Sequence, residues 1–154
     1  MNIELPPQTG QLPHADPNPV TAPFWEGCAR GELLFQRCGQ CGSATFPPIE
    51  HCRECLAFDQ RWESSRGLGR LYSWTVVSRP VTPAFTAPYA AAIVTLDEGY
   101  TMVTNVIGTS SDQLRVDLPV QVAYHKVGAD LVLPYFEPAR PAFLPYRSDP
   151  LVGG

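Results

Sequence analysis

Residues 38–55 read CGQCGSATFPPIEHCREC and place two Cys-x-x-Cys pairs on either side of a ten-residue loop. Each pair offers two sulfurs on one side of a tight backbone turn, and four thiolates at the corners of a tetrahedron are common ligands of structural zinc. Two pairs at this separation form a much stronger metal-binding pattern than one pair alone. We therefore predict that one zinc ion is held by Cys38, Cys41, Cys52 and Cys55.

Other interpretations of these cysteines stay open at the level of the sequence. Rubredoxin-type iron uses the same four ligands, and disulfides would form in an oxidising compartment. A thioredoxin-like redox pair is disfavoured, because it requires a strand-to-helix junction in an α/β pattern that this sequence lacks. His51 lies beside Cys52, but four thiolates already complete the coordination sphere, which favours a structural zinc over a catalytic one.

The segment ahead of the cysteines begins with an arm. Six prolines among residues 1–23 remove backbone donors, so this arm is expected to be extended or disordered. A short helix is predicted next, with Thr21 as its cap and Pro23 in its first turn. The helix presents Phe24 and Trp25 together, either packed on the domain or as an aromatic anchor for a partner or ligand.

The remaining pattern is mostly β. Short strand-like runs at residues 32–37, 44–46 and 61–63 complete a zinc ribbon around the cysteines. Five longer segments rich in β-branched and aromatic residues follow, at residues 70–79, 90–96, 100–107, 119–127 and 131–136. Hairpin turns are predicted at residues 97–99 and 127–130. Five strands that must close their edges on one another predict an OB-fold barrel.

The predicted fold class is therefore mostly β, with a short N-terminal helix, a zinc ribbon and a five-stranded OB-fold barrel. The predicted boundaries are an arm over residues 1–23, helix and ribbon over 24–66, the barrel over 67–138 and a tail over 139–154. On the first barrel strand, Tyr72, Trp74 and Val76 alternate with other residues, which predicts one strongly apolar face.

Composition limits the partners. The chain has 154 residues, a formal net charge of -4 and a single lysine, Lys126. Clustered Lys and Arg provide most of the non-specific affinity for nucleic acid, so nucleic acid is not expected as a partner. No apolar run approaches the roughly 20 residues of a membrane span, and the first residues lack the basic and apolar regions of a signal peptide. A cytoplasmic protein with no membrane partner is expected.

Several motifs in combination resemble the DUF35 family of zinc-ribbon plus OB-fold proteins. They are the Phe24-Trp25-Glu26 helix, GELLFQRCGQCG at residues 31–42, GRLYSWTVV at residues 69–77, AIVTLDEG at residues 92–99 and YFEP at residues 135–138. The resemblance covers residues 23–138. It implies an accessory subunit that binds a thiolase-fold enzyme acting on acyl-CoA, with acyl-CoA as a candidate ligand. Cleavage of a steroid side chain by a thiolase-like aldolase is the preferred setting, followed by an acyltransferase complex.

No catalytic residue is predicted, because the sequence has no GxSxG elbow, HExxH motif, Walker loop or paired cysteine and histidine. Contacts with ligand or partner are expected from the loop after the first barrel strand as well as from the helix, because loops on a rigid barrel commonly carry recognition. The expected contact residues are Phe24, Trp25, Trp74, Arg79, Phe85 and Tyr89. Arg79 is a candidate for pairing with a phosphate of coenzyme A.

Two rival functions are weighed against the accessory role. A single-strand nucleic-acid module would stack bases on aromatic residues such as Tyr72, Trp74 and Tyr124, but the acidic charge opposes it. An independent enzyme would need Cys28 or zinc-bound water, and Cys28 is expected to be a buried or incidental thiol. The tail over residues 139–154 spaces apolar residues by prolines, so it is expected either to thread over a partner or to fray.

Overall fold

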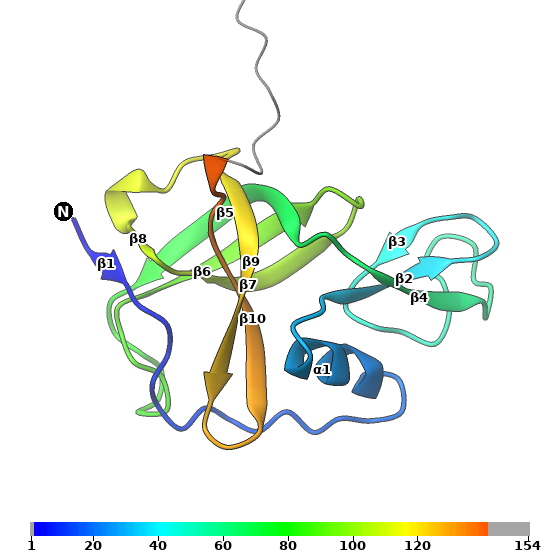
Figure 1. Ribbon diagram of the computed structural model, residues 1–154, viewed down its shortest axis with the longest axis horizontal. Coiled ribbons are helices and arrows are strands. Elements are labelled where there is room, and N and C mark those ends of the chain that lie inside the picture. Colours follow the sequence, from blue (N-terminus) through cyan, green and yellow to red (C-terminus); the bar gives the residue numbers. More distant parts are fainter. Residues whose placement is uncertain (1, 142–154) are drawn as a thin grey trace, which may run out of the picture.

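β-Branched and aromatic residues fill five long segments, and these segments close into a barrel in the computed structural model, which describes residues 2–141 (Figure 1). The barrel strands are β5 (Leu68–Val77), β6 (Tyr89–Leu96), β7 (Thr101–Val106), β9 (Pro119–Val127) and β10 (Leu131–Pro138). Neighbours follow the order β10-β7-β6-β5-β9, and only β10 with β7 is parallel. This closed order confirms the predicted five-stranded barrel.

A helix and a small sheet precede the barrel. The helix α1 spans Ala22–Ala29, and the sheet contains β2 (Leu34–Cys38), β3 (Ala44–Thr45) and β4 (Gln60–Ser64) in the antiparallel order β3-β2-β4. Figure 1 shows this sheet beside the barrel, with α1 lying next to β10. The predicted bounds of the helix and strands agree with the observed ones to within two residues.

The start of the arm pairs with a short strand that lies outside the barrel sheet. β1 (Glu4–Leu5) forms an antiparallel pair with β8 (Thr109–Ser110), which leads into a 3-10 turn at Ser111–Gln113. The Leu5 side chain is buried in the core. Neither short strand is among the predicted elements, because a two-residue pair leaves no periodic pattern in the sequence.

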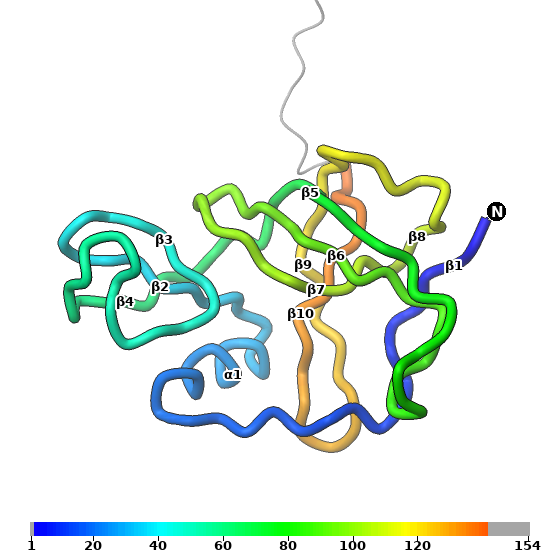
Figure 2. The backbone as a smooth tube through the Cα atoms, turned by 180° about the vertical axis from the view of Figure 1, so that it is seen from behind, coloured from blue at the N-terminus to red at the C-terminus, as the bar shows by residue number. Residues whose placement is uncertain are grey.

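The arm is extended, and a buried glutamine anchors it. The Gln8 side chain donates to the Thr86 carbonyl at 3.0 Å and accepts from the Thr86 N–H at 2.7 Å, so it completes a pair of hydrogen bonds with the β5–β6 loop. Beyond Gln8 the arm runs across the β9–β10 hairpin toward α1, as both backbone views show (Figure 2). The arm therefore connects the far side of the barrel to the helix without leaving the surface of its own chain.

One hydrophobic core extends from the barrel into the ribbon. Its fully buried barrel side chains include Leu71, Val94, Val106, Val120 and Phe136. At the ribbon end, Phe35 of β2 stacks on Tyr100 with ring centroids 4.8 Å apart and an interplanar angle of 19°. Phe24 of α1 packs on Phe46 at 5.1 Å. Because these rings come from the helix, the ribbon and the barrel, buried aromatic contacts join the three parts.

The linker between β4 and β5 is fastened to the β6–β7 turn. The Arg66 N–H donates to Glu98 at 2.7 Å, and its guanidinium pairs with Asp97 at 2.9 Å. Gly67 has a φ of +69°, and a Cβ there would collide with the Val122 side chain, so the linker backbone passes directly over β9. The predicted hairpin at residues 97–99 is confirmed, and its two carboxylates order the junction between ribbon and barrel.

Two local predictions are wrong. The register of β5 shifts between Leu71 and Ser73, and this irregularity leaves Tyr72 exposed while Leu71 and Trp74 pack on the core. A bulge of this kind displaces the alternation by one residue, so the apolar face does not include Tyr72. Thr21 precedes α1 as predicted, but its hydroxyl accepts from the Asn18 N–H at 3.1 Å and does not cap the helix.

Within residues 2–141, α1 is the only α-helix, and none of the helices there has the length and apolar content needed to cross a membrane. Most of the predicted tail, residues 142–154, lies outside the described residues.

Candidate metal centre and apolar groove

The four cysteines of the two Cys-x-x-Cys turns meet at one point in the ribbon. Their sulfurs all lie within 4.8 Å of one another, and the Sγ–Sγ distance is 3.6 Å both for Cys38 with Cys55 and for Cys41 with Cys52. A zinc–sulfur bond of about 2.3 Å gives a tetrahedron with edges of about 3.8 Å. The donor set and its spacing therefore fit a tetrahedral zinc with no coordination position left for a substrate.

The two turns are equivalent halves of this site. The Gln40 N–H donates to Cys38 Sγ at 3.4 Å, and the Glu54 N–H donates to Cys52 Sγ at 3.4 Å. Backbone donors aimed at a sulfur stabilise the thiolate form, which is the form that binds metal. Each half therefore supports its ligands with its own backbone.

Ser43 is a functional residue that the sequence-based prediction does not include. Its hydroxyl lies 3.2 Å from the sulfurs of both Cys41 and Cys52. The hydrogen bond between Ser43 and Cys52, together with the backbone amides of Cys55 and Glu54, lowers the pKa of Cys52 to about 6. The same serine lowers the pKa of Cys41. Ser43 therefore favours two of the four thiolates, and its position just after the first pair is the signal that could have identified it.

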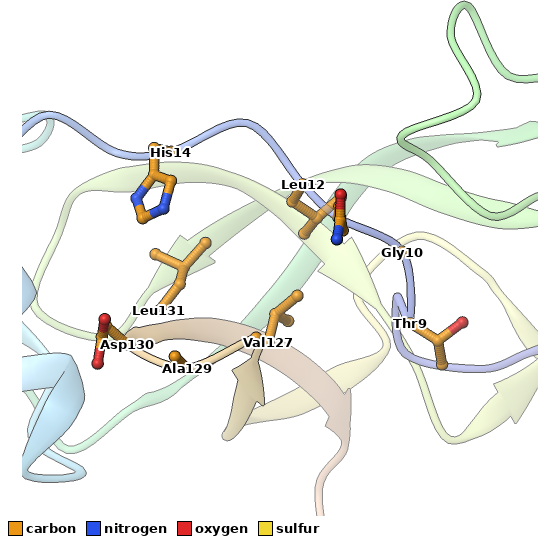
Figure 3. A pocket seen from close by; sticks show the side chains of 10 residues that line it. Thr9, Gly10, Leu12, His14, Val127, Ala129, Asp130 and Leu131 are labelled. Atoms are coloured by element: carbon orange, nitrogen blue, oxygen red, sulfur yellow. The ribbon is translucent and has the colours of Figure 1, made fainter.

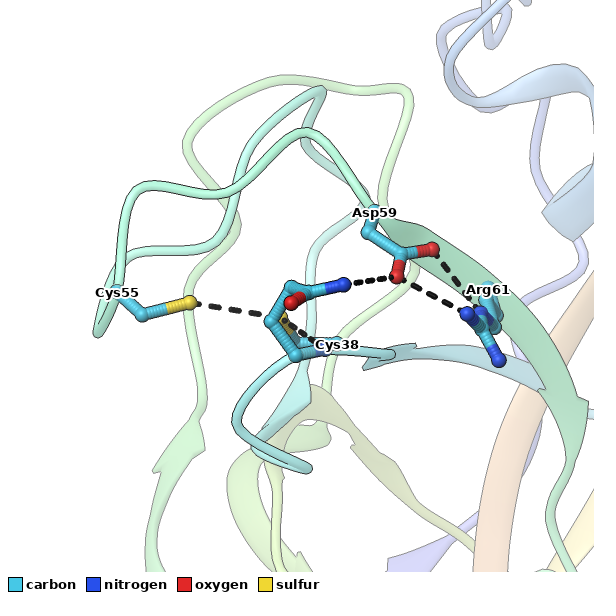
Figure 4. A network of polar contacts seen from close by, with 5 residues as sticks. Cys38, Cys55, Asp59 and Arg61 are labelled. Atoms are coloured by element: carbon cyan, nitrogen blue, oxygen red, sulfur yellow. Dashed lines mark hydrogen bonds and ion pairs between the residues drawn. The ribbon is translucent and has the colours of Figure 1, made fainter.

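A polar network ties the first cysteine turn to β4 (Figure 4). The Asp59 carboxylate accepts from the Arg61 guanidinium at 3.0 Å and from the Gln40 amide at 2.9 Å, and the Asp59 carbonyl accepts from the Gly39 N–H at 2.8 Å. The Arg61 guanidinium, with Gln40, holds the pKa of Asp59 below its usual value. Exposed ion pairs contribute little stability, so the network mainly positions the turn.

A mostly apolar groove of about 320 Å³ lies between α1 and the strands β7 and β10. Its lining is Phe24, Trp25, Phe46, Ala91, Met102, Val103, Thr104, Asn105, Leu133, Pro134 and Tyr135. Phe24 is buried against Trp25 with ring centroids 5.1 Å apart, and Trp25 is half-buried. Val103 of β7 is 76% exposed at this groove. The helix therefore forms one wall of an apolar groove whose other wall is the barrel surface, and the groove is open to solvent.

Five of the six predicted contact residues fall into two groups, and Trp74 stands apart. Phe24 and Trp25 line the groove, as described above. Phe85 and Tyr89 lie at the β5–β6 loop with ring centroids 6.0 Å apart, and Arg79 is exposed near the start of the same loop. Within the described part of the chain, the Arg79 side chain has no ion-pair partner. Trp74 is half-buried and packs on the core.

Cys28 differs from the four cysteines of the cluster. It lies on α1, is buried, and belongs to the hydrophobic core. Burial raises the pKa of its thiol to about 12. The side chain therefore stays protonated and behaves as a small apolar residue at neutral pH.

A second cavity, of about 570 Å³, lies between the arm and the β9–β10 hairpin (Figure 3). Thr9 and His14 approach it from the arm, and Asp130 and Leu131 from the hairpin. The sequence-based prediction does not include this cavity, because it depends on the path of the arm across the hairpin.

Comparison with protein families supports this architecture. The ChsH2 rubredoxin-like zinc ribbon domain matches residues 25–59, and the ChsH2 C-terminal OB-fold domain matches residues 62–125. The first match contains all four cysteines, so the cluster is that of a zinc ribbon and supports a structural zinc. The second match contains β5 to β7 and most of β9.

Some curated relatives are enzyme subunits, and others are scaffold proteins. A probable enoyl-CoA hydratase alpha subunit of Thermomonospora curvata is 37% identical, over 87% of this chain and 44% of the relative. The 3-oxo-4,17-pregnadiene-20-carboxyl-CoA hydratase alpha subunit of Mycobacterium tuberculosis is 31% identical, over 68% and 33%. The chain therefore spans less than half the length of these hydratase subunits. A DUF35 domain-containing scaffold protein of Methanothermobacter thermautotrophicus is 33% identical, over 69% of this chain and 84% of the relative.

The similar solved structures include the following two. A chain of the Ltp2-ChsH2(DUF35) aldolase superposes with a TM-score of 0.75 and 34% identity, and the match covers 81% of this chain and 98% of that one. A DUF35 protein of unknown function from Sulfolobus solfataricus gives a TM-score of 0.55 at 15% identity, over 68% of this chain and 78% of that one, which shows the shared fold.

Proposed function

The chain belongs to the DUF35 family, and from that membership we propose that it is a non-catalytic accessory subunit that binds a thiolase-fold enzyme acting on acyl-CoA. The observation that carries the proposal is the match to the Ltp2-ChsH2(DUF35) aldolase, because it covers nearly the whole of a chain that belongs to a multi-component enzyme. The relative described as a scaffold protein supports a role in assembly.

We place the complex, by preference, in the retro-aldol cleavage of a steroid side-chain CoA thioester. The aldolase match and the pregnadiene-carboxyl-CoA hydratase relative support this setting. The partner enzyme provides the general base and any nucleophile, while the chain provides a rigid ribbon and an apolar groove. A thiolase-like acyltransferase complex is the alternative, and there too the partner enzyme provides the catalytic groups.

A single-strand nucleic-acid module is the less supported rival. Base stacking needs aromatic faces that are open to solvent. Trp74 and Tyr124 are half-buried and packed against the core, which leaves Tyr72 as the exposed member of the three candidates.

Affinity purification of the tagged chain from its native host tests the accessory role. We expect a thiolase-fold protein at constant stoichiometry, identified by mass spectrometry, and acyl-CoA turnover by the complex but not by the isolated chain. A chain that purifies as a monomer with no such partner contradicts the proposal. Turnover by the isolated chain contradicts its non-catalytic part.

The groove is proposed to receive the acyl chain, which gives a prediction for Val103. Val103→Asp places a carboxylate beside apolar groups, and we expect it to raise KM for CoA thioesters with a large apolar acyl group, such as a steroid side chain, by about tenfold, or about 1.4 kcal/mol. KM for substrates with a short acyl group should change little, because a short acyl group has little apolar surface to bury in the groove. Val103→Thr, which is similar in shape and uncharged, serves as the control. A KM for the substrates with a large apolar acyl group that is the same in Val103→Asp as in the wild type would exclude the groove as the acyl site.

Arg79 is proposed to pair with a phosphate of coenzyme A. Arg79→Ala is expected to raise KM for every acyl-CoA by about threefold to tenfold, since a charge-assisted contact with phosphate contributes about 1 kcal/mol when it is solvent-exposed. Arg115→Ala is the matched control, because Arg115 is also exposed and its side chain has no ion pair among residues 2–141. Steady-state kinetics of the assembled complex provide the measurement, and an unchanged KM would remove Arg79 from the site.

A further inference from the structure

The two cysteine turns have similar backbones but carry different residues directly after their second cysteine. Gly42 follows Cys41 with a φ of +76° and donates its N–H to the Cys38 carbonyl at 2.9 Å. Leu56 follows Cys55 with a φ of +62° and donates its N–H to the Cys52 carbonyl at 3.0 Å. The geometry thus calls for glycine at both positions, and the second turn carries leucine instead.

Burial of the Leu56 side chain does not offset the strain of this backbone conformation. A side chain in the left-handed region costs roughly 1–2 kcal/mol relative to glycine. Burial could offset this cost, but Leu56 is 67% exposed. At the equivalent position in the first turn, a Cβ on Gly42 would meet nothing within 4 Å, so the position faces solvent in that turn too. Neither the turn nor the core therefore explains the leucine.

A second exposed apolar side chain lies two residues further along. Phe58 is 81% exposed, and its ring lies 5.6 Å from the ring of His51. We call His51, Leu56 and Phe58 the knuckle patch. An exposed aromatic residue and an exposed aliphatic residue two positions apart, directly after a cysteine turn, have the composition of an anchor in a protein interface.

Charges around the knuckle patch indicate what would cover it. Glu50, Arg53 and Glu54 are exposed, and none of them takes part in an ion pair within the described range of residues. The other charges of the ribbon sheet are already paired, Arg37 with Glu63 and Arg61 with Asp59. Two carboxylates against one guanidinium, on a chain of net charge -4, leave an acidic border. A partner surface with Lys or Arg at its margin complements that border.

We propose that the knuckle patch docks into an apolar pocket, bordered by Lys or Arg side chains, on the thiolase-fold partner. This inference rests on the proposed function, because it assigns the contact surface of that same complex. Leu56 and Phe58 are the anchors, and the zinc site holds the turn that carries them.

The effect of Leu56→Gly on the unfolding temperature, compared with its effect on partner binding, separates docking from a structural role. Because glycine suits the backbone there, Leu56→Gly should bind zinc as the wild type does and unfold at the same temperature or a higher one. Its Kd for the thiolase-fold protein that copurifies with the wild type should nevertheless rise by about tenfold or more, as should that of Phe58→Ala. Val116→Ala is the control, because Val116 is an exposed apolar residue outside the ribbon. Calorimetric titration measures each Kd.

The rates of association and dissociation test the role of the acidic border. Glu50→Lys/Glu54→Lys should slow association with the same partner by several-fold while changing dissociation little, because border charges act mainly on encounter. The wild-type association rate should also fall as salt is added.

Each contrary result has a distinct meaning. Unchanged Kd values for both Leu56→Gly and Phe58→Ala would overturn the docking site and leave the accessory role in place. A lower unfolding temperature for Leu56→Gly would show that leucine serves the turn, which also overturns the inference. A wild-type homodimer that Leu56→Gly dissociates would assign the knuckle patch to a second copy of the chain. If no thiolase-fold protein copurifies at all, the proposed function and this inference fail together.

Discussion

Cys38→Ser is expected to abolish zinc binding and to unfold the ribbon. Cys38 is buried, and its sulfur lies 3.6 Å from that of Cys55, so its loss leaves an incomplete tetrahedron. Zinc contributes about 10–16 kcal/mol to small zinc domains at neutral pH, and this binding energy is also folding energy. The ribbon sheet has strands of 2 to 5 residues, which are too short to stay folded without the metal.

Metal content per chain, circular dichroism and limited proteolysis of the ribbon provide the measurements for Cys38→Ser. Cys28→Ser is the matched control, since it makes the same substitution at a buried thiol outside the cluster, and it should retain the zinc. A Cys38→Ser protein that is folded throughout and free of metal would show that the cluster is not a structural site. Iron in place of zinc, found in the wild-type protein, would correct the identity of the ion and leave the site intact.

Phe35→Ala is expected to destabilise the protein by about 3–5 kcal/mol, because truncating a buried aromatic residue loses its burial energy and leaves a cavity. Phe35 comes from the ribbon strand β2 and stacks on Tyr100, which directly precedes β7, so the cavity would lie in the contact between ribbon and barrel. A loss of this size is a large share of the stability of a typical domain.

Phe58→Ala is the matched control for Phe35→Ala, because it removes the same atoms from an exposed position in the same ribbon. Its free energy of unfolding should change by less than about 0.5 kcal/mol. Chemical denaturation of both variants, with zinc present throughout, measures the difference. Similar effects for the two variants would mean that the stacked rings do not join the ribbon to the barrel.

The sequence predicts the parts of this fold that have a local signature. The spacing of the two cysteine pairs predicts the cluster of four sulfurs, and the β6–β7 turn is predictable because Asp97-Glu98-Gly99 suits a tight hairpin. The barrel strands are predictable because long β-branched runs have no helical alternative. Residue type and short-range order are sufficient in each of these cases.

Features that depend on distant partners are not predictable in this way. The β1–β8 pair joins residues about a hundred positions apart, and the bulge at Tyr72 depends on how β5 meets β6. Ser43 contacts two sulfurs only after both turns have come together. The groove exists because α1 folds back on β10, so Phe24 and Trp25 could be predicted as an aromatic anchor but the wall facing them could not.

The pairing of the arm with β8 has a consequence for the order in which the newly made protein matures. Ile3 and Ser111 are linked by a hydrogen bond across 108 positions of sequence, so the arm cannot make this contact until the residues that follow β8 have been translated. The four cysteines, in contrast, lie within 17 positions of one another and can take up metal while the barrel strands are still being made. A ribbon loaded during translation would then be a finished surface against which β5 to β10 assemble. The arm would attach only after β8 has appeared, later than the ribbon.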